Sequence, residues 1–213
     1  MLQAAIFDLD GTLLYTLPDL ARSVNFAMRT LGFPERSFEQ IRSYIGNGIE
    51  NLVRCALPEG TPAEIQSRAI RIFREHYSQN SQIDTRPYDG IPELLEALRS
   101  RNIGTAIVSN KPDGDVQVLN RAWFRVDVAI GESSACRRKP APDMVLAACA
   151  RLGVRPEECA YIGDSEVDHA TAAAAGCHCI LVSWGYRSRE RLEALPGAKI
   201  ADTPEEVLSG LLR

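Results

Sequence analysis

The chain has 213 residues, of which 45% are hydrophobic and 24% charged, and its formal net charge is −4. This length predicts one domain, or one domain with a smaller insert. The composition is typical of a globular protein and excludes a disordered chain. The slight acidic excess argues against a general nucleic-acid-binding surface, which is usually basic.

The six cysteines do not indicate a secreted, disulfide-bonded protein, because a chain of this length can build its core without crosslinks. Met1–Asp10 has no basic start and contains two aspartates, so we expect no signal peptide. No stretch approaches about 18 uncharged apolar residues, which excludes a membrane-spanning helix. We therefore expect a cytoplasmic protein with reduced thiols and no membrane partner.

In chain order, short apolar runs alternate with segments of helical periodicity. The predicted strands are Ala4–Phe7, Thr105–Val108, Val126–Ile130, Ala160–Ile162 and Cys179–Val182. The predicted helices between them are Pro92–Arg101, Pro142–Leu152 and Val167–Ala175. Because the strands are apolar on both faces, we expect an α/β fold whose parallel sheet is covered by helices on both sides.

The interval after the first strand breaks this pattern, because residues 15–84 contain no convincing strand. The predicted helices there are Pro18–Leu31, Phe38–Tyr44, Ile49–Leu57 and Pro62–Gln79. A block of this size is far longer than an ordinary connection between a strand and a helix. We therefore expect a helical domain over residues 15–84, inserted into an α/β core formed by residues 1–14 and 85–213.

Polar residues follow three of the predicted strands, namely 4–7, 105–108 and 160–162. A further polar residue precedes the predicted helix 142–152, which leads to the strand 160–162. They are Asp8 and Asp10, Ser109 and Asn110, Asp164 and Asp168, and Lys139. Because parallel strands present their carboxyl ends at one edge of the sheet, we expect these side chains to converge there. Clustered carboxylates require a cation or shared protons, and an all-oxygen site suits Mg²⁺. A nucleophile, an acid and a lysine beside such a cation meet the needs of phosphoryl transfer.

Four ordered motifs carry a family resemblance over nearly the whole chain. They are Asp8-Leu-Asp-Gly-Thr-Leu13, Ser109-Asn-Lys-Pro112, Lys139-Pro-Ala-Pro142 and Gly163-Asp-Ser-Glu-Val-Asp168. This set resembles the haloacid dehalogenase-like hydrolase superfamily, and the helical insert resembles that family's type-one cap on a Rossmann-like three-layer core. Ile45-Gly-Asn-Gly48, Pro87-Tyr-Asp-Gly90 and Trp184-Gly-Tyr186 are similar to segments of phosphoglycolate phosphatases.

The resemblance implies a role for each motif residue. Asp8 is the expected nucleophile, and Asp10 is the expected general acid and base. The carboxylates of Asp8 and Asp164, with the backbone carbonyl of Asp10, are the expected Mg²⁺ ligands. Ser109 and the Asn110 amide are expected to bind phosphoryl oxygens, and Lys139 to neutralise nucleophile and phosphate. Asp168 is expected to orient Lys139 or a metal-bound water.

The resemblance predicts a Mg²⁺-dependent phosphatase for a small phosphorylated metabolite, with 2-phosphoglycolate as the first candidate substrate. A phosphohexose mutase on the same scaffold and a non-enzymatic phospho-acceptor module are alternatives. Asp10, two residues after the nucleophile, favours a phosphatase over a haloacid dehalogenase. The insert argues against the phospho-acceptor module, which needs no lid. The chain leaves open whether the protein is a monomer or a homodimer.

Two shorter segments have competing interpretations. Gly46 and Asn47 belong either to a plain turn between helices or to a loop that binds substrate. Cys177-His178-Cys179 contains potential metal ligands, but strand geometry sends the two cysteines to one face and the histidine to the other. We therefore expect small, buried thiols at this position.

Overall fold

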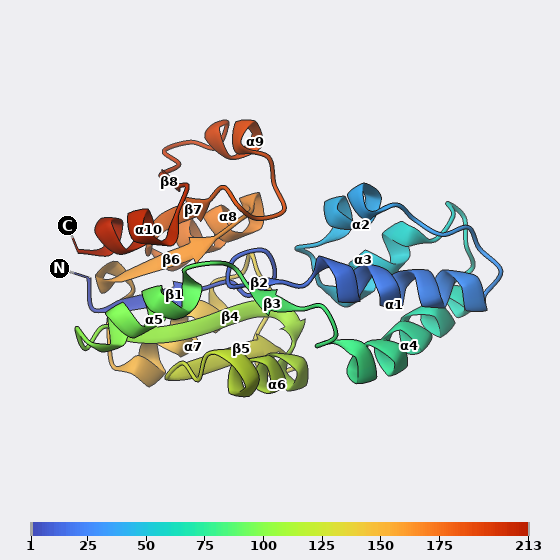
Figure 1. Ribbon diagram of the computed structural model, residues 1–213, viewed down its shortest axis with the longest axis horizontal. Coiled ribbons are helices and arrows are strands. Elements are labelled where there is room, and N and C mark those ends of the chain that lie inside the picture. Colours follow the sequence, from blue (N-terminus) through green and yellow to red (C-terminus); the bar gives the residue numbers. More distant parts are fainter. Residues whose placement is uncertain (1, 213) are drawn as a thin grey trace. The chain divides into compact units, whose positions relative to one another are not determined.

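The computed structural model describes residues 2–212, and none of the helices in this range is both long and apolar enough to cross a membrane. The chain forms two compact units (Figure 1). One consists of Met1–Leu14 and Pro87–Arg213, and the other of Tyr15–Arg86.

The first unit is built on a parallel sheet with the strand order β5-β4-β1-β6-β7-β8. The strands are β1 (Ala4–Phe7), β4 (Gly104–Pro112), β5 (Val128–Glu132), β6 (Cys159–Gly163), β7 (His178–Val182) and β8 (Ile200–Ala201). Register pairs Ile6 with Ala106 on one side and with Tyr161 on the other. The central strands are therefore hydrogen-bonded on both edges and buried.

Helices cover both faces of this sheet. They are α5 (Ile91–Arg99), α6 (Asp113–Trp123), α7 (Asp143–Leu152), α8 (Glu166–Ala175) and α10 (Pro204–Leu211). The short helix α9 (Arg189–Glu193) follows β7 in the chain, and a 3-10 turn spans Pro156–Glu158. Alternate strand residues face opposite ways, so Phe7 packs in the core beneath α5, α6 and α10, whereas Ile6 packs beneath α7 and α8. The expected Rossmann-like three-layer α/β fold is confirmed.

The position of β1 determines where a ligand can bind to this sheet. After β1 the chain builds β4 and β5 on one side, and it then crosses to build β6, β7 and β8 on the other. The connections on the two sides therefore diverge beyond the carboxyl end of β1. Such a point is the usual ligand site of an open parallel sheet.

The second unit is helical. It contains α1 (Leu17–Thr30), α2 (Phe38–Tyr44), α3 (Gly48–Ala56) and α4 (Ala63–Asn80). Each helix turns an apolar face inward, and Val24, Ile41, Val53 and Phe73 are fully buried. Ser37 and Gln40 form a capping box that fixes the start of α2.

The two segments that join the units pair with each other as a short two-stranded sheet, β2 (Leu14–Tyr15) and β3 (Arg86–Pro87). Within the helical unit, the buried carboxylate of Asp19 accepts hydrogen bonds from the backbone amides of Asp84 at 3.0 Å and Thr85 at 2.9 Å. This carboxylate therefore fastens the returning segment to the first helix.

Several elements differ from the sequence-based expectation. The expected strand 105–108 continues through residue 112 as β4, with an irregular register after Val108. The expected strand 126–130 is shifted to Val128–Glu132. Helix α6 follows β4 directly and was not expected, since its sequence is polar and contains Gly114.

Candidate active site

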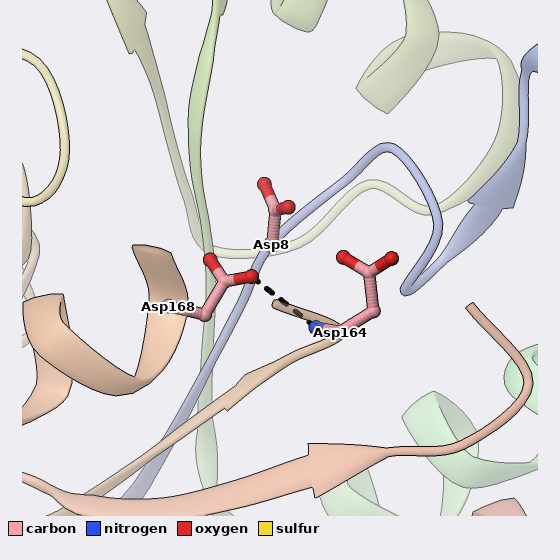
Figure 2. Close-up of side chains that lie close together, drawn as sticks. All are labelled: Asp8, Asp164 and Asp168. Carbon is pink, nitrogen blue, oxygen red and sulfur yellow. Dashed lines mark hydrogen bonds between the residues drawn. The ribbon is translucent and has the colours of Figure 1, made fainter. Parts of the chain in front are cut away.

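The polar residues singled out from the sequence of the first unit meet at the carboxyl edge of its sheet. Asp8 follows β1, Ser109 and Asn110 lie in the last part of β4, and Asp164 follows β6. Asp168 lies in the first turn of α8. Lys139 lies in the loop that precedes α7. Figure 2 shows the three carboxylates of Asp8, Asp164 and Asp168 around one space.

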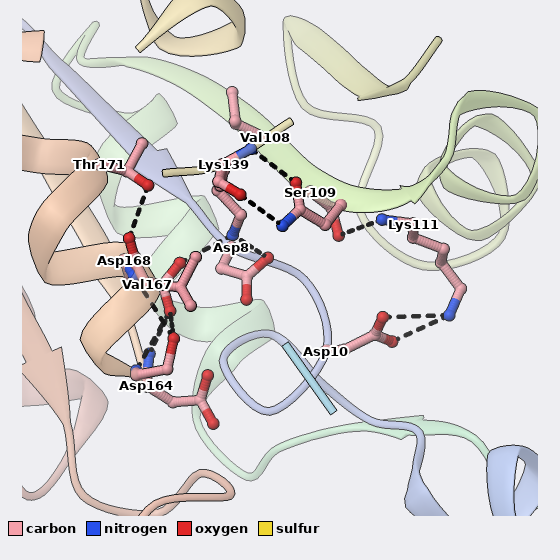
Figure 3. A network of polar contacts seen from close by, with 12 residues as sticks. Asp8, Asp10, Val108, Ser109, Lys111, Lys139, Asp164, Val167, Asp168 and Thr171 are labelled. Carbon is pink, nitrogen blue, oxygen red and sulfur yellow. Dashed lines mark hydrogen bonds and ion pairs between the residues drawn. The ribbon is translucent and has the colours of Figure 1, made fainter. Parts of the chain in front are cut away.

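The ammonium group of Lys139 lies between two aspartates (Figure 3). Its Nζ is 2.8 Å from Asp8 Oδ1 and 2.7 Å from Asp168 Oδ1, and it donates to the Tyr161 hydroxyl at 3.0 Å. All four side chains are buried. Burial alone would lower the pKa of Lys139, but the charges of Asp168 and Asp8 outweigh it and raise that pKa well above its ordinary value. Lys139 is therefore a permanent cation.

The carboxylate of Asp168 has its acceptor capacity filled by the protein. Oδ1 accepts from Lys139 and from the Tyr161 hydroxyl at 3.2 Å. Oδ2 accepts from the Ser165 hydroxyl at 2.6 Å and from the backbone amides of Ser165 and Asp164 at 3.1 and 3.2 Å. Since an ionised carboxylate offers about four lone-pair sites, Asp168 is suited to orienting Lys139 and the 164–165 turn.

Asp164 is held by backbone groups that approach it closely. Its Oδ2 accepts from the Tyr186 amide at 2.6 Å. A Cβ atom at Gly185 would lie 2.2 Å from Asp164 Cβ, and one at Gly11 would lie 2.4 Å from Asp164 Oδ2. Larger residues at either glycine would therefore displace this carboxylate.

Asn110 positions Lys139 through the backbone. Its Oδ1 accepts from the Lys139 amide at 2.7 Å, and its Nδ2 donates to the Lys139 carbonyl at 3.1 Å. The side chain of Asn110 is thus committed to the Lys139 loop, and the expected contact of its backbone amide with a phosphoryl oxygen stays a prediction. The buried hydroxyl of Ser109 accepts a hydrogen bond from the Lys111 amide at 3.3 Å.

Asp10 has a partner that the sequence did not indicate. Both of its carboxylate oxygens lie 3.1 Å from the Nζ atom of Lys111 (Figure 3). The side chain of Lys111 is only 1% exposed, and that of Asp10 is 15% exposed. Lys111 therefore sets the position of the Asp10 carboxylate.

Burial raises the pKa values of the Asp8 and Asp164 carboxylates. That of Asp8 rises to about 7, mainly through loss of solvent, although Lys139 partly opposes the shift. Burial and the neighbouring charges of Asp168 and Asp8 raise the pKa of Asp164 well above its usual range. Three carboxylates here face one ammonium group, and the remaining negative charge is stable only with protons or a further cation.

The donor set fits Mg²⁺. Asp8 and Asp164 supply hard carboxylate oxygens, and their raised pKa values indicate charge that a cation would stabilise. The close approach of Gly11 and Gly185 to Asp164 keeps side-chain bulk away from this carboxylate. Asp168 lies in the same acidic group but already accepts five hydrogen bonds.

Four other candidate residues do not belong to the acidic group of Asp8, Asp164 and Asp168. Trp184 donates its indole N–H to the Thr12 carbonyl at 3.0 Å, so it supports the loop after Asp10. His169 meets the Pro196 carbonyl at 3.0 Å rather than the carboxylates. Gly46 and Asn47 belong to the helical unit, in the turn between α2 and α3, and their expected contact with substrate stays a prediction.

Sequence reasoning missed three contributors to the site: Lys111, Tyr161 and Gly185. Lys111 lies within the motif Ser109-Asn-Lys-Pro112 but received no role there, and its place in that motif was a usable signal. Tyr161 lies inside a strand that was assigned from its apolar character. The need for glycine at 185 depends on a tertiary contact with Asp164, which no local pattern reveals.

Comparison with known proteins places the chain in a family. The haloacid dehalogenase-like hydrolase family model matches residues 5–182. Phosphoglycolate phosphatase of Nitrosospira multiformis is 38% identical over 192 residues, covering 87% of this chain and 85% of the relative. A Lactobacillus delbrueckii subsp. bulgaricus structure, provisionally described as a phosphoglycolate phosphatase, has a TM-score of 0.94 and 36% identity, and covers 99% of both chains. CbbY from Rhodobacter sphaeroides, solved with xylulose-(1,5)bisphosphate, has a TM-score of 0.79 and 27% identity, with 99% of both chains covered. The chain belongs to the haloacid dehalogenase-like hydrolase family, is similar to its phosphoglycolate phosphatases, and is a phosphoric monoester hydrolase.

Proposed function

We propose that this hydrolase is a Mg²⁺-dependent phosphatase that cleaves a small phosphate monoester through an aspartyl-phosphate on Asp8. The observation that carries the proposal is the buried Asp8 carboxylate, 2.8 Å from the Lys139 ammonium and grouped with Asp164. The similarity to phosphoglycolate phosphatases supports 2-phosphoglycolate as the first candidate substrate.

Each side chain then has a defined task. A carboxylate oxygen of Asp8 is the nucleophile. Lys139 neutralises both this carboxylate and the incoming phosphoryl group. Asp10 protonates the leaving oxygen and later accepts a proton from the hydrolytic water. Ser109 and the Asn110 backbone amide bind phosphoryl oxygens.

The metal would be held by the carboxylates of Asp8 and Asp164 and by the backbone carbonyl of Asp10. When bound, Mg²⁺ supplies charge that offsets the repulsion between these carboxylates and a phosphate. Asp168 remains with Lys139 and the Ser165 turn, where it orients rather than binds.

We further propose that residues 15–84 act as a cap that selects the leaving group, with Gly46 and Asn47 in its substrate loop. All of the residues that perform the proposed chemistry lie in the other unit. The core unit alone lacks contacts that would distinguish one leaving group from another, and the cap would supply them. A lid also excludes water during the reaction.

The first test is release of inorganic phosphate from a panel of phosphorylated metabolites, 2-phosphoglycolate and a sugar bisphosphate included. Asp8→Asn should lower kcat by at least about 10³-fold, because an amide does not form an acyl phosphate. Its thermal unfolding midpoint serves as the folding control. Activity within tenfold of the wild type would exclude Asp8 as nucleophile, and isomerised sugar phosphate without free phosphate would favour a mutase.

The metal proposal predicts a pH-dependent affinity. Protons and Mg²⁺ compete for Asp8 and Asp164, and the pKa of Asp8 is raised to about 7. Below this pH the apparent Kd for Mg²⁺ should therefore rise by up to about tenfold per pH unit. Calorimetric titration of the chelator-treated protein measures it. An affinity that stays constant as the pH falls from 7 to about 6 would contradict this account.

Lys111 provides a test of the acid. Lys111→Met removes the cation that holds Asp10, so kcat should fall about tenfold more for an alkyl phosphate than for an aryl phosphate, whose leaving group needs less protonation. Lys111→Arg should restore part of the difference. In an Asp10→Asn background the Lys111 substitution should have little further effect on kcat. Equal losses on both ester types would show that Lys111 does not act through Asp10.

The cap proposal makes a separate prediction about specificity. Asn47→Ala should lower kcat/KM for the preferred metabolite much more than for a generic aryl phosphate, which depends less on contacts with the cap. Comparable losses on both substrates would place the role of Asn47 in folding. Unchanged kinetics on both would identify residues 46–48 as a plain turn.

A further inference from the structure

Three cysteines meet in the first unit at the end of the sheet opposite the carboxylates. Cys149 lies on α7, Cys159 is the first residue of β6, and Cys177 immediately precedes β7. The Sγ atoms of Cys149 and Cys159 are 3.6 Å apart. The Cys149 thiol also interacts with that of Cys177. The sequence predicts small, buried thiols at Cys177 and Cys179, but both are partly exposed. It does not predict the contacts of Cys177 and Cys159 with Cys149, because these residues lie far apart in the chain.

The sulfur atoms of Cys149 and Cys159 are in van der Waals contact. A disulfide bond is about 2.05 Å long, so the two sulfur atoms need to approach by only about 1.5 Å. The Cys149 and Cys159 side chains are buried at 2% and 0% exposure, whereas Cys177 is partly exposed. Of the three thiols, Cys177 is therefore the one that solvent reaches.

The three thiols differ in reactivity because Cys149 occupies the central position. Contacts with the Cys159 and Cys177 thiols lower the pKa of Cys149, and the contacts with Cys149 together with burial raise the pKa values of these two neighbours. Since the thiolate is the reactive form of cysteine, Cys149 is the nucleophile of the group.

We propose that Cys149, Cys159 and Cys177 form a site of reversible oxidation by hydroperoxides, which closes a disulfide between Cys149 and Cys159. The Cys149 thiolate attacks one oxygen of hydrogen peroxide, the O–O bond breaks, and the departing hydroxide takes a proton to give water. The resulting sulfenic acid is attacked by the Cys159 sulfur as that thiol loses its proton. The S–S bond forms, the S–O bond breaks, and a second water leaves.

The disulfide would join α7 to the start of β6 without reaching the catalytic carboxylates, which lie beyond the other end of β6. Oxidation should therefore leave kcat within about twofold and raise the thermal unfolding midpoint by roughly 5 °C. The thiol site does not depend on the phosphatase proposal, because disulfide formation and unfolding are measured without substrate.

The test is peptide mapping of the full chain, first reduced and then exposed to a few equivalents of hydrogen peroxide before alkylation. The expected product is a Cys149–Cys159 crosslink that a dithiol reverses. Cys159→Ser should abolish the crosslink and leave a Cys149 sulfenic acid that dimedone traps. Cys177→Ala, which removes the contact with the Cys149 thiol, should slow oxidation of Cys149 about tenfold. Cys179→Ala is the matched control and should change neither the rate nor the product.

Two results would overturn the proposal. One is a Cys149 thiol that stays reduced at peroxide concentrations that fully oxidise the exposed Cys55. The other is a crosslink that joins Cys149 to a residue other than Cys159, or Cys159 to a residue other than Cys149.

Discussion

The buried ammonium group of Lys139 is the interaction on which the rest of this site depends. An unpaired ammonium at this depth would be strongly destabilising, and removal of either neighbouring carboxylate would leave uncompensated charge. Asp8 and Asp168 supply the opposing charge at 2.8 and 2.7 Å. Asn110 and Tyr161 then restrict where this charge can lie, the first through the Lys139 backbone and the second through its Nζ atom.

The carboxylates at the carboxyl edge of the sheet outnumber the ammonium groups that face them, and this excess of negative charge affects what the site can bind. Lys139 neutralises part of the negative charge of Asp8 and Asp168, whereas the Asp164 carboxylate accepts a hydrogen bond from the Tyr186 backbone amide. Lys111 is already engaged by Asp10. The site therefore carries an excess of buried negative charge, and the raised pKa values of Asp8 and Asp164 are its expression. Such an excess would repel a phosphate unless a cation offset it, as the proposed Mg²⁺ would.

The sequence predicts the parts of this protein that depend on local pattern. Strands buried on both faces are visible as short apolar runs, and their carboxyl ends identify Asp8 and Asp164. The two-residue strand β8 is too short to give a pattern, and the extension of β4 through Pro112 depends on pairing with β5. The bonds of Asn110 to the Lys139 loop, and the fit of Gly185 against Asp164, join segments far apart in the chain. They could be found only once the fold was known.

The Asp168 side chain both caps a helix and positions the Lys139 ammonium group. With Ser165 it forms the capping box that begins α8, and its carboxylate satisfies the amides of Asp164 and Ser165. The same carboxylate holds Lys139 in place. The helix start therefore fixes the distance between the Asp164 turn and the ammonium group, so the geometry is set before any ligand arrives. Preorganisation of this kind explains why an acidic residue is buried completely at a helix terminus, where an exposed serine cap alone would have sufficed for the helix.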